Sequence, residues 1–302
     1  MGLNELGAAE LAWAYRAGTL SPVEVAQAVL DHMARWEPAL CATYLLQPEL
    51  TLAQARASEA RWRAGQPLSA LDGVPMTLKD NIATAGDPMP LGTAATDLSP
   101  MAADAPPAAR LREAGAVLVA KTTMPDYGML SSGLSSFHAL ARNPWDLSKT
   151  PGGSSAGAGS AAAAGYGPLH LGTDIGGSIR LPAGWCGVFG LKPSLGRVPI
   201  DPPYTGRAAG PMTRTVADAA AMMQVLSLPD ARDHMSLPYE EIDWGALDRE
   251  VKGLRIGVQQ ATTGATFVDA KLRPTTPAKV FPDTTSMFTA LLANQIDVAM
   301  TD

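Results

Sequence analysis

The sequence of 302 residues contains few cysteines, few histidines and no excess of positive charge. The two cysteines, Cys41 and Cys186, cannot form a disulfide framework, and they indicate free thiols in a reducing compartment. The formal net charge is −6, which provides no basic surface for nucleic acid. The first residues lack the basic and apolar regions of an export signal, and no apolar run approaches the roughly 20 residues that span a bilayer. We therefore expect a cytoplasmic protein without nucleic-acid or membrane partners.

The rest of the composition is typical of a globular protein, since 46% of the residues are hydrophobic. Helical and strand-like patterns alternate along the chain. The predicted helices cover residues 5–16, 22–36, 52–63, 108–114 and 216–226, and the predicted strands cover residues 74–78, 116–120 and 254–258. This alternation predicts an α/β fold in which helices cover the faces of a sheet.

One segment, residues 149–182, is dominated by glycine, serine and alanine: KTPGGSSAGAGSAAAAGYGPLHLGTDIGGSIRLP. It contains two glycine-flanked serine sites, one at Ser154 and Ser155 and the other at Ser178. Glycine lets a main chain approach a ligand closely, and successive backbone N–H groups can bind an anion. A linker has a similar composition. Residues 169–175 argue against a linker because they are apolar and need burial.

A lysine follows the first predicted strand. Residues 74–78 are apolar and lead directly into Lys79. Burial disfavours the charged ammonium group, which lowers the pKa of a lysine and can leave a neutral amine that acts as a base. The alternative is an exposed lysine that pairs with Asp80.

The loop-rich stretch of residues 121–143 carries aromatic and apolar side chains among serines. Such side chains usually pack in a core, but a loop beside a reactive centre uses them to line a substrate pocket. The candidates for substrate binding are Tyr127, Gly128, Met129 and Leu130.

Two general motifs compete for the serines. Residues 153–157 match the G-x-S-x-G nucleophile elbow with Ser155 as the nucleophile, but the polar residues before it do not form the buried strand that this motif needs. Only His170 and His234 follow it in the chain. Residues 157–162 match the dinucleotide pattern G-x-G-x-x-G/A, again without a preceding strand. Both matches are weak.

A third interpretation joins Lys79 to the two serine sites. The runs GVPMTLKD, TPGGSSAGAGS and GTDIGGSIRLPAGWCGVFGLKPS resemble the amidase signature family, serine hydrolases that use a Ser-Ser-Lys triad. The flanking runs EAGAVLVAKTTMPDYG and ARNPWD fit as well, and the resemblance covers residues 5–258. It implies an α/β/α layered fold, with a mixed twisted sheet covered by helices, and an amidase signature domain over residues 1–252.

The resemblance also implies roles for individual residues. Ser178 is the nucleophile, Ser154 is a relay serine that follows a cis peptide bond, and Lys79 is the base. The implied oxyanion hole consists of the backbone N–H groups of Ile175, Gly176, Gly177 and Ser178. Structural support is expected from Ser155, Asp174 and Arg180. Ala156 replaces a glycine that is common in the family.

The chemistry of such a site agrees with elementary arguments. A serine hydroxyl attacks an amide poorly without a base, and no histidine is placed to serve. A buried neutral lysine can accept the proton through a second hydroxyl and return it to the departing amine. We therefore expect an amidase, free of metal and organic cofactors, that hydrolyses a small carboxamide or a related anilide, carbamate or ester through an acyl-enzyme.

Two alternatives to this amidase stay open, namely an esterase that uses Ser155 and a catalytically inactive, amidase-like binding remnant. Amidotransferases that work in larger complexes share the same triad. The sequence favours no single substrate and no oligomeric state.

Residues 253–302 depart from the family pattern. The pieces GVQQATTG and FPDTTSMFTALLANQIDVAMTD resemble extracellular amino-acid-binding proteins of transport systems, which indicates a junction near Lys252. The pattern predicts alternating strands and helices, with strands at residues 254–259, 278–281 and 296–300 and helices after Thr262 and at residues 284–294. A piece of this size buries too little surface to be stable alone. We therefore expect it to dock on the amidase sheet, with residues 254–258 added as a strand.

Overall fold

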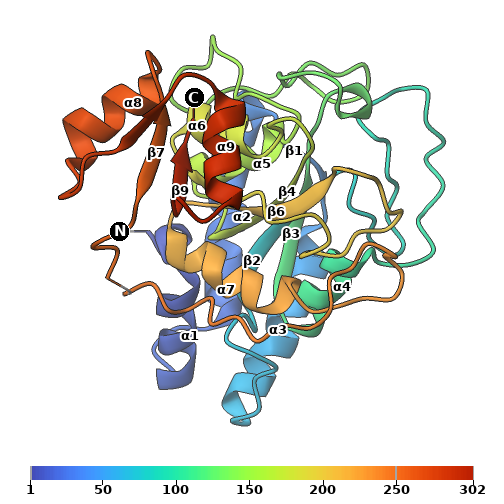
Figure 1. Cartoon of the computed structure of the whole chain (residues 1–302). Coiled ribbons are helices and arrows are strands. Elements are labelled where there is room, and N and C mark those ends of the chain that lie inside the picture. The colour runs from blue at the N-terminus through green and yellow to red at the C-terminus, as the bar shows by residue number, and fades with distance from the viewer. Residues whose placement is uncertain (1, 249, 302) are drawn as a thin grey trace. The chain divides into compact units, whose positions relative to one another are not determined.

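The computed structural model describes residues 2–248 and 250–301 (Figure 1). The chain divides into two compact units, Met1–Gly245 and Ala246–Asp302. This division lies near the junction that the sequence predicts at Lys252. Each unit has its own sheet.

The first unit contains a six-stranded mixed sheet with the order β1-β3-β2-β4-β6-β5. Strands β3, β2 and β4 are parallel to one another, whereas β1, β6 and β5 are antiparallel to the strands they join. The bounds are β1 (Thr43–Leu46), β2 (Pro75–Lys79), β3 (Val117–Thr122), β4 (Leu169–Asp174), β5 (Phe189–Gly190) and β6 (Ala208–Thr213). The central strands β2, β3 and β4 are buried along their whole length, as strands covered on both faces must be.

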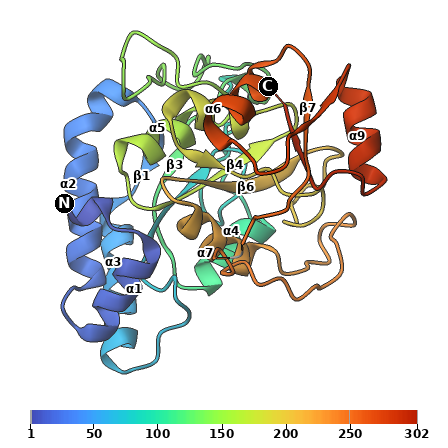
Figure 2. The same ribbon diagram turned by 60° about the vertical axis from the view of Figure 1, so that its left-hand side comes forward.

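The helices of the first unit largely follow the predicted ranges. They are α1 (Ala8–Ala17), α2 (Pro22–Leu40), α3 (Pro48–Arg63), α4 (Pro106–Glu113), α5 (Ala156–Ala164), α6 (Arg180–Cys186) and α7 (Val216–Leu226), with 3-10 turns at Leu3–Glu5 and Asp126–Gly128. Helix α2 begins with a capping box, because Ser21 Oγ accepts from the N–H of Val23 and the Glu24 carboxylate accepts from the N–H of Ser21. Helices α2 and α3 lie side by side (Figure 2).

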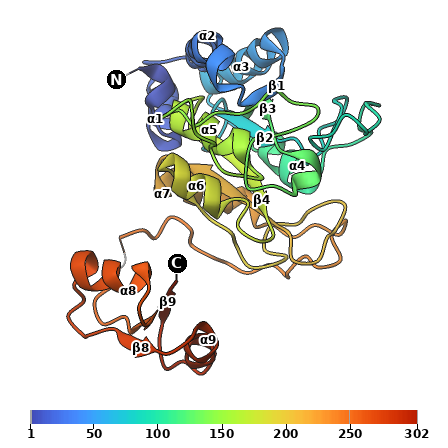
Figure 3. The ribbon, with the colours of Figure 1, turned by 90° about the horizontal axis from the view of Figure 1, so that it is seen from above.

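Side-chain alternation in β2 separates the two faces of the sheet. Met76 and Leu78 belong to the cluster that contains residues of α4 and α7, whereas Lys79 contacts the serines directly before α5. Helices α4 and α7 therefore cover one face, and α5 covers the other, with α6 beside it (Figure 3). The predicted α/β/α fold is confirmed.

Helix α5 was not predicted. It occupies the alanine- and glycine-rich run, and every residue from Pro151 to Ala162 is buried. A linker would be exposed, so the linker interpretation of this run is wrong. Small side chains are needed here because a Cβ added to Gly157 would clash with the carbonyl oxygen of Ala42 and the N–H of Thr123.

The second unit is a small α/β unit around a parallel sheet with the order β8-β7-β9. Its elements are β7 (Ile256–Gln259), α8 (Thr263–Phe267), a π-helical turn (Val268–Leu272), β8 (Lys279–Phe281), α9 (Thr284–Leu292) and β9 (Val298–Met300). These agree with the predicted order of elements. A cluster of Phe281, Met287, Ala290 and Ile296 forms its core.

One expectation for this unit is wrong. Residues 254–258 were expected to join the amidase sheet as a strand, but β7 is the central strand of the second sheet, and β8 and β9 occupy its two edges. Docking of the segment by other surfaces stays a prediction.

Among the helices of the described residues, none combines the length and the apolar character needed to cross a membrane.

Candidate active site

The Lys79 side chain ends β2 and is completely buried. Its Nζ atom lies 2.8 Å from Ser154 Oγ, 3.0 Å from Ser155 Oγ and 3.0 Å from Thr173 Oγ1. The strand places the amine on the face of the sheet that α5 covers, where the three hydroxyls surround it. The alternative of an exposed lysine is therefore wrong.

The hydrogen atoms of this cluster can be assigned to partners. Ser155 Oγ donates to the carbonyl oxygen of Thr173 at 3.1 Å, and Thr173 Oγ1 can donate to Asn81 Oδ1 at 3.4 Å. Both hydroxyls are then free to accept from Lys79. A neutral amine has two N–H groups and one lone pair, so its lone pair is left for the hydroxyl hydrogen of Ser154.

Burial lowers the pKa of Lys79 from its ordinary value to about 7. The nearby carboxylate of Asp80 opposes this shift, and the Arg207 guanidinium favours it. An appreciable fraction of Lys79 is therefore neutral at physiological pH.

Ser154 and Ser155 connect this lysine to the segment that carries Ser178. The peptide bond between Gly153 and Ser154 is cis. The N–H of Ser155 donates to the carbonyl oxygen of Ser178 at 3.1 Å. Ser155 is fully buried, whereas Ser178 is half-buried.

The turn before Ser178 is fixed by the buried carboxylate of Asp174. Its Oδ1 accepts from the N–H of Gly177, and its Oδ2 accepts from the N–H of Ile179, both at 2.9 Å. Arg180 binds the same carboxylate through Nε and Nη2. Burial alone would raise the pKa of Asp174, but the hydrogen bonds from Arg180 and the backbone outweigh it and hold the pKa well below its usual range.

This turn corrects the expected oxyanion hole. The N–H of Gly177 already donates to Asp174, so it cannot serve as one of the four donors. The remaining N–H groups of the expected set belong to Ile175, Gly176 and Ser178. Lys192 supports the same turn, because its Nζ donates to the carbonyl oxygen of Ile175 at 2.6 Å.

Ser154 and Ser178 line one cavity of about 670 Å³, within the usual range for small-molecule sites. All four residues expected to bind substrate line it too. The full lining is Asn81, Leu91, Met124, Tyr127, Gly128, Met129, Leu130, Ser131, Ser154, Thr173, Ile175, Gly176, Ser178, Leu181, Tyr204 and Arg207. Gly128 has a positive φ of 71°, and a Cβ there would lie 3.2 Å from Ser154 Oγ.

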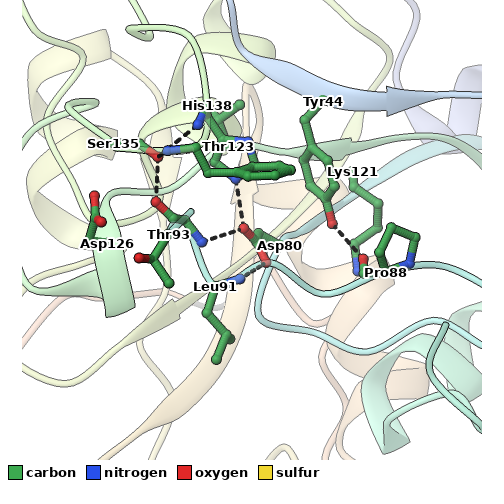
Figure 4. A network of polar contacts seen from close by, with 12 residues as sticks. Tyr44, Asp80, Pro88, Leu91, Thr93, Lys121, Thr123, Asp126, Ser135 and His138 are labelled. Carbon is green, nitrogen blue, oxygen red and sulfur yellow. Dashed lines mark hydrogen bonds and ion pairs between the residues drawn. The ribbon is translucent and has the colours of Figure 1, made fainter. Parts of the chain in front are cut away.

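The carboxylate of Asp80, directly after Lys79, anchors the loops around this cavity (Figure 4). It is fully buried and accepts from His138 Nε2 at 2.7 Å and from the N–H groups of Leu91 and Gly92 at 2.9 and 2.8 Å. The Leu91 carbonyl oxygen in turn accepts from the N–H of Tyr127 at 2.8 Å.

The competing motif interpretations do not fit the structure. The buried Ser155 hydroxyl is held by Lys79 and Thr173 rather than exposed on an elbow. The ring nitrogens of His170 bond to Thr77 Oγ1 and the carbonyl oxygen of Gly167. The dinucleotide pattern at residues 157–162 lies within helix α5, not at a strand-to-helix turn. Among the described residues, no group of three or more metal-ligating side chains has the arrangement of a metal site.

Sequence reasoning missed several residues of the site. Asn81 and Thr173 contact the lysine cluster, and each stands beside a residue already singled out, which was an available signal. His138 and Arg207 lie far from every motif, and no sequence pattern marks them.

A family model described as Amidase matches residues 24–277, which continues past Lys252 into the second unit. A glutamyl-tRNA(Gln) amidotransferase subunit of Chloroflexus aggregans is 43% identical over 250 residues, covering 81% of this chain and 51% of that protein. The protein of the same name from Myxococcus xanthus is 42% identical over 269 residues, covering 85% and 54%. The chain thus spans about half the length of the curated relatives it matches.

Solved structures are similar over most of this chain. A bacterial aryl acylamidase of the amidase signature enzymes is 32% identical with a TM-score of 0.82, covering 94% of this chain and 63% of that one. The native peptide amidase of Stenotrophomonas maltophilia is 30% identical with a TM-score of 0.80, covering 98% and 62%. Because the family model matches most of the chain and these structures share its fold, the chain belongs to the amidase signature family.

Proposed function

We propose that this chain hydrolyses a carbon–nitrogen amide bond through an acyl-enzyme on Ser178, with Ser154 as proton relay and Lys79 as base. The observation that carries this proposal is the buried Lys79 amine, 2.8 Å from Ser154 Oγ, beside a cavity that Ser178 also lines. Its lowered pKa makes the amine available as a base near neutral pH.

The reaction proceeds in two steps. In the first, Ser178 Oγ attacks the amide carbon and gives its proton to Ser154, which passes its own proton to Lys79. The carbon–nitrogen bond breaks as the proton returns through Ser154 to the departing amine. In the second step, a water molecule attacks the ester on Ser178, and the same relay carries its proton, so that the acid leaves and the serine is restored.

The negative charge that develops on the carbonyl oxygen needs preorganised donors. The backbone N–H groups of Ile175, Gly176 and Ser178 are the donors we propose, now without Gly177. Asp174, Arg180 and Lys192 hold this turn in shape. One such donor contributes about 3 to 4 kcal/mol to transition-state stabilisation.

The substrates we propose are small carboxamides and related anilides, carbamates and esters. The cavity size and the apolar side chains of Leu91, Met124, Met129 and Leu130 suit a small apolar group beside the reacting carbonyl. The structural likeness to an aryl acylamidase and a peptide amidase supports this class.

A second candidate is favoured by the names of the curated relatives. Both are named as subunits of a glutamyl-tRNA(Gln) amidotransferase, so this chain would release ammonia from an amide for use by a partner protein. Hydrolysis of free glutamine, increased by added partner proteins, would favour this candidate over a stand-alone amidase.

A substrate panel tests the proposal. Acyl anilides, primary amides, carbamates and esters are compared by kcat/KM in the wild-type chain, in Ser178→Ala and in the control Ser148→Ala, whose hydroxyl bonds only to Asp146. We expect turnover of at least one class in the wild type and the control and none in Ser178→Ala. Turnover that survives Ser178→Ala would overturn the proposal, and inertness of the wild type to the whole panel would favour the inactive remnant.

A further inference from the structure

Arg207 is the one charged residue among the described residues that line the cavity. It directly precedes β6, and the antiparallel register of β4 and β6 places it across from Ile175, at the start of the loop that leads to Ser178. A Cβ on the adjacent Gly206 would lie 3.9 Å from Ile175 Cγ2. The guanidinium group is therefore on the same side of the cavity as the nucleophile's loop.

The positive charge of Arg207 lacks a partner within the described part of the chain. No carboxylate there lies within ion-pair distance of it, and its buried Nε has no hydrogen-bond partner. Only Nη2 is engaged, with the carbonyl oxygen of Pro202 at 2.7 Å, while the Tyr204 ring packs 5.4 Å from the guanidinium carbon. Arg180 differs, because two of its nitrogens bind Asp174.

A partly buried cation without a counter-ion is costly, and burial accordingly lowers the pKa of Arg207. The opposite wall of the cavity, with Leu91, Met124, Met129 and Leu130, offers no charge to balance it. A bound anion would supply both the missing charge and an acceptor for the unpaired Nε. The flat guanidinium fork matches the two oxygens of a carboxylate.

We propose that Arg207 binds a carboxylate group of the substrate, so that the cavity selects amides that carry an acid group. This inference rests on the proposed amide hydrolysis at Ser178 and names the substrate class for it. The carboxylate lies against Arg207 and Tyr204, and the apolar part of the substrate lies against the opposite wall.

Two matched substrate pairs test both ends of the amide. The 4-nitroanilide of succinic acid, with its acid on the acyl side, is compared with the 4-nitroanilide of butyric acid. N-butyryl-4-aminobenzoate, with its acid on the leaving amine, is compared with N-butyryl-4-aminobenzamide. The measured quantity is the ratio of kcat/KM for the acidic substrate to kcat/KM for its neutral counterpart.

The ratios are measured in the wild type, Arg207→Met, Arg207→Lys and the control Arg63→Met, whose arginine is 75% exposed at the end of α3. For at least one pair, we expect Arg207→Met to lower the ratio about 10- to 100-fold, the range for a charged hydrogen bond. Arg207→Lys should restore part of it, because it keeps the charge without the fork. Arg63→Met should leave the ratio unchanged.

Fluorophosphonate labelling of Ser178 in each variant separates the two proposals. Ratios that Arg207→Met leaves unchanged for both pairs, with labelling and neutral turnover intact, overturn the carboxylate inference and leave the proposed hydrolysis standing. Absence of both turnover and labelling in the wild type overturns the proposed hydrolysis, and the inference falls with it.

Discussion

The backbone N–H of Ser155 donates to the carbonyl oxygen of Ser178 at 3.1 Å. This bond joins the segment that follows the cis peptide to the segment of the proposed nucleophile without using either hydroxyl. The two segments therefore keep their relative position when a serine side chain is removed. Substitutions at these serines can test chemistry separately from folding.

The two hydroxyls should respond differently to removal. Ser155 Oγ is buried and bonds to Lys79 and to the backbone of Thr173, so Ser155→Ala should lower the free energy of unfolding by about 1 to 3 kcal/mol and reduce kcat without abolishing it. Ser178→Ala should leave stability within about 0.5 kcal/mol of the wild type. Chemical denaturation and kcat measurements check both, and the reverse pattern would contradict the assigned roles.

Activity should depend on the charge of Lys79. Its burial lowers the pKa to about 7, and only the neutral amine accepts a proton, so kcat/KM should rise with pH, level off above about pH 7 and fall nearly tenfold per unit well below it. Lys79→Arg should lose about 100-fold or more, because a guanidinium does not deprotonate in proteins. Near wild-type activity of Lys79→Arg at neutral pH would show that positive charge, not basicity, is required.

His138 should act through the loops of the cavity. Its Nε2 bonds to the buried Asp80 carboxylate, which also holds the N–H groups of Leu91 and Gly92. His138→Ala should therefore lower the free energy of unfolding by about 1.5 to 3 kcal/mol and raise KM more than it lowers kcat, since Leu91 lines the cavity. His138→Gln keeps a donor and should recover part of the loss; equal effects of the two variants on KM would contradict this account.

Much of the fold and the core of the site could be predicted because local chemistry determined them. Ser21 and Glu24 cap their helix through neighbouring backbone groups, and Lys79 ends a strand apolar enough to require burial. The pairing of Asp80 with His138 could not be predicted, because it joins residues 58 positions apart through a loop without periodicity. The helix after Ser155 was missed because alanine and glycine carry no amphipathic pattern.

The edge pairing of residues 254–258 was mispredicted for a different reason. A short apolar strand has no preference between two sheets, and here the strands at residues 279–281 and 298–300 compete for its edges. The resemblance of residues 253–302 to transport-system binding proteins stays a hypothesis.

Removal of the second unit tests whether it supports the first. Its core of Phe281, Met287, Ala290 and Ile296 is too small to be stable alone. If the segment docks on the amidase unit, truncation after Lys252 should cause aggregation or loss of cooperative melting in calorimetry. A truncated chain with the melting curve and the activity of the full chain would rule out docking.

Covalent labelling of the nucleophile tests the central claim most directly. The wild-type chain, Ser178→Ala and Ser155→Ala are treated with a fluorophosphonate, and the modified residue is located by mass spectrometry of peptides. The account predicts one adduct on Ser178 in the wild type and in Ser155→Ala, formed faster as the pH rises through about 7, and none in Ser178→Ala. An adduct on Ser155, or no adduct on the folded wild-type chain, would contradict it.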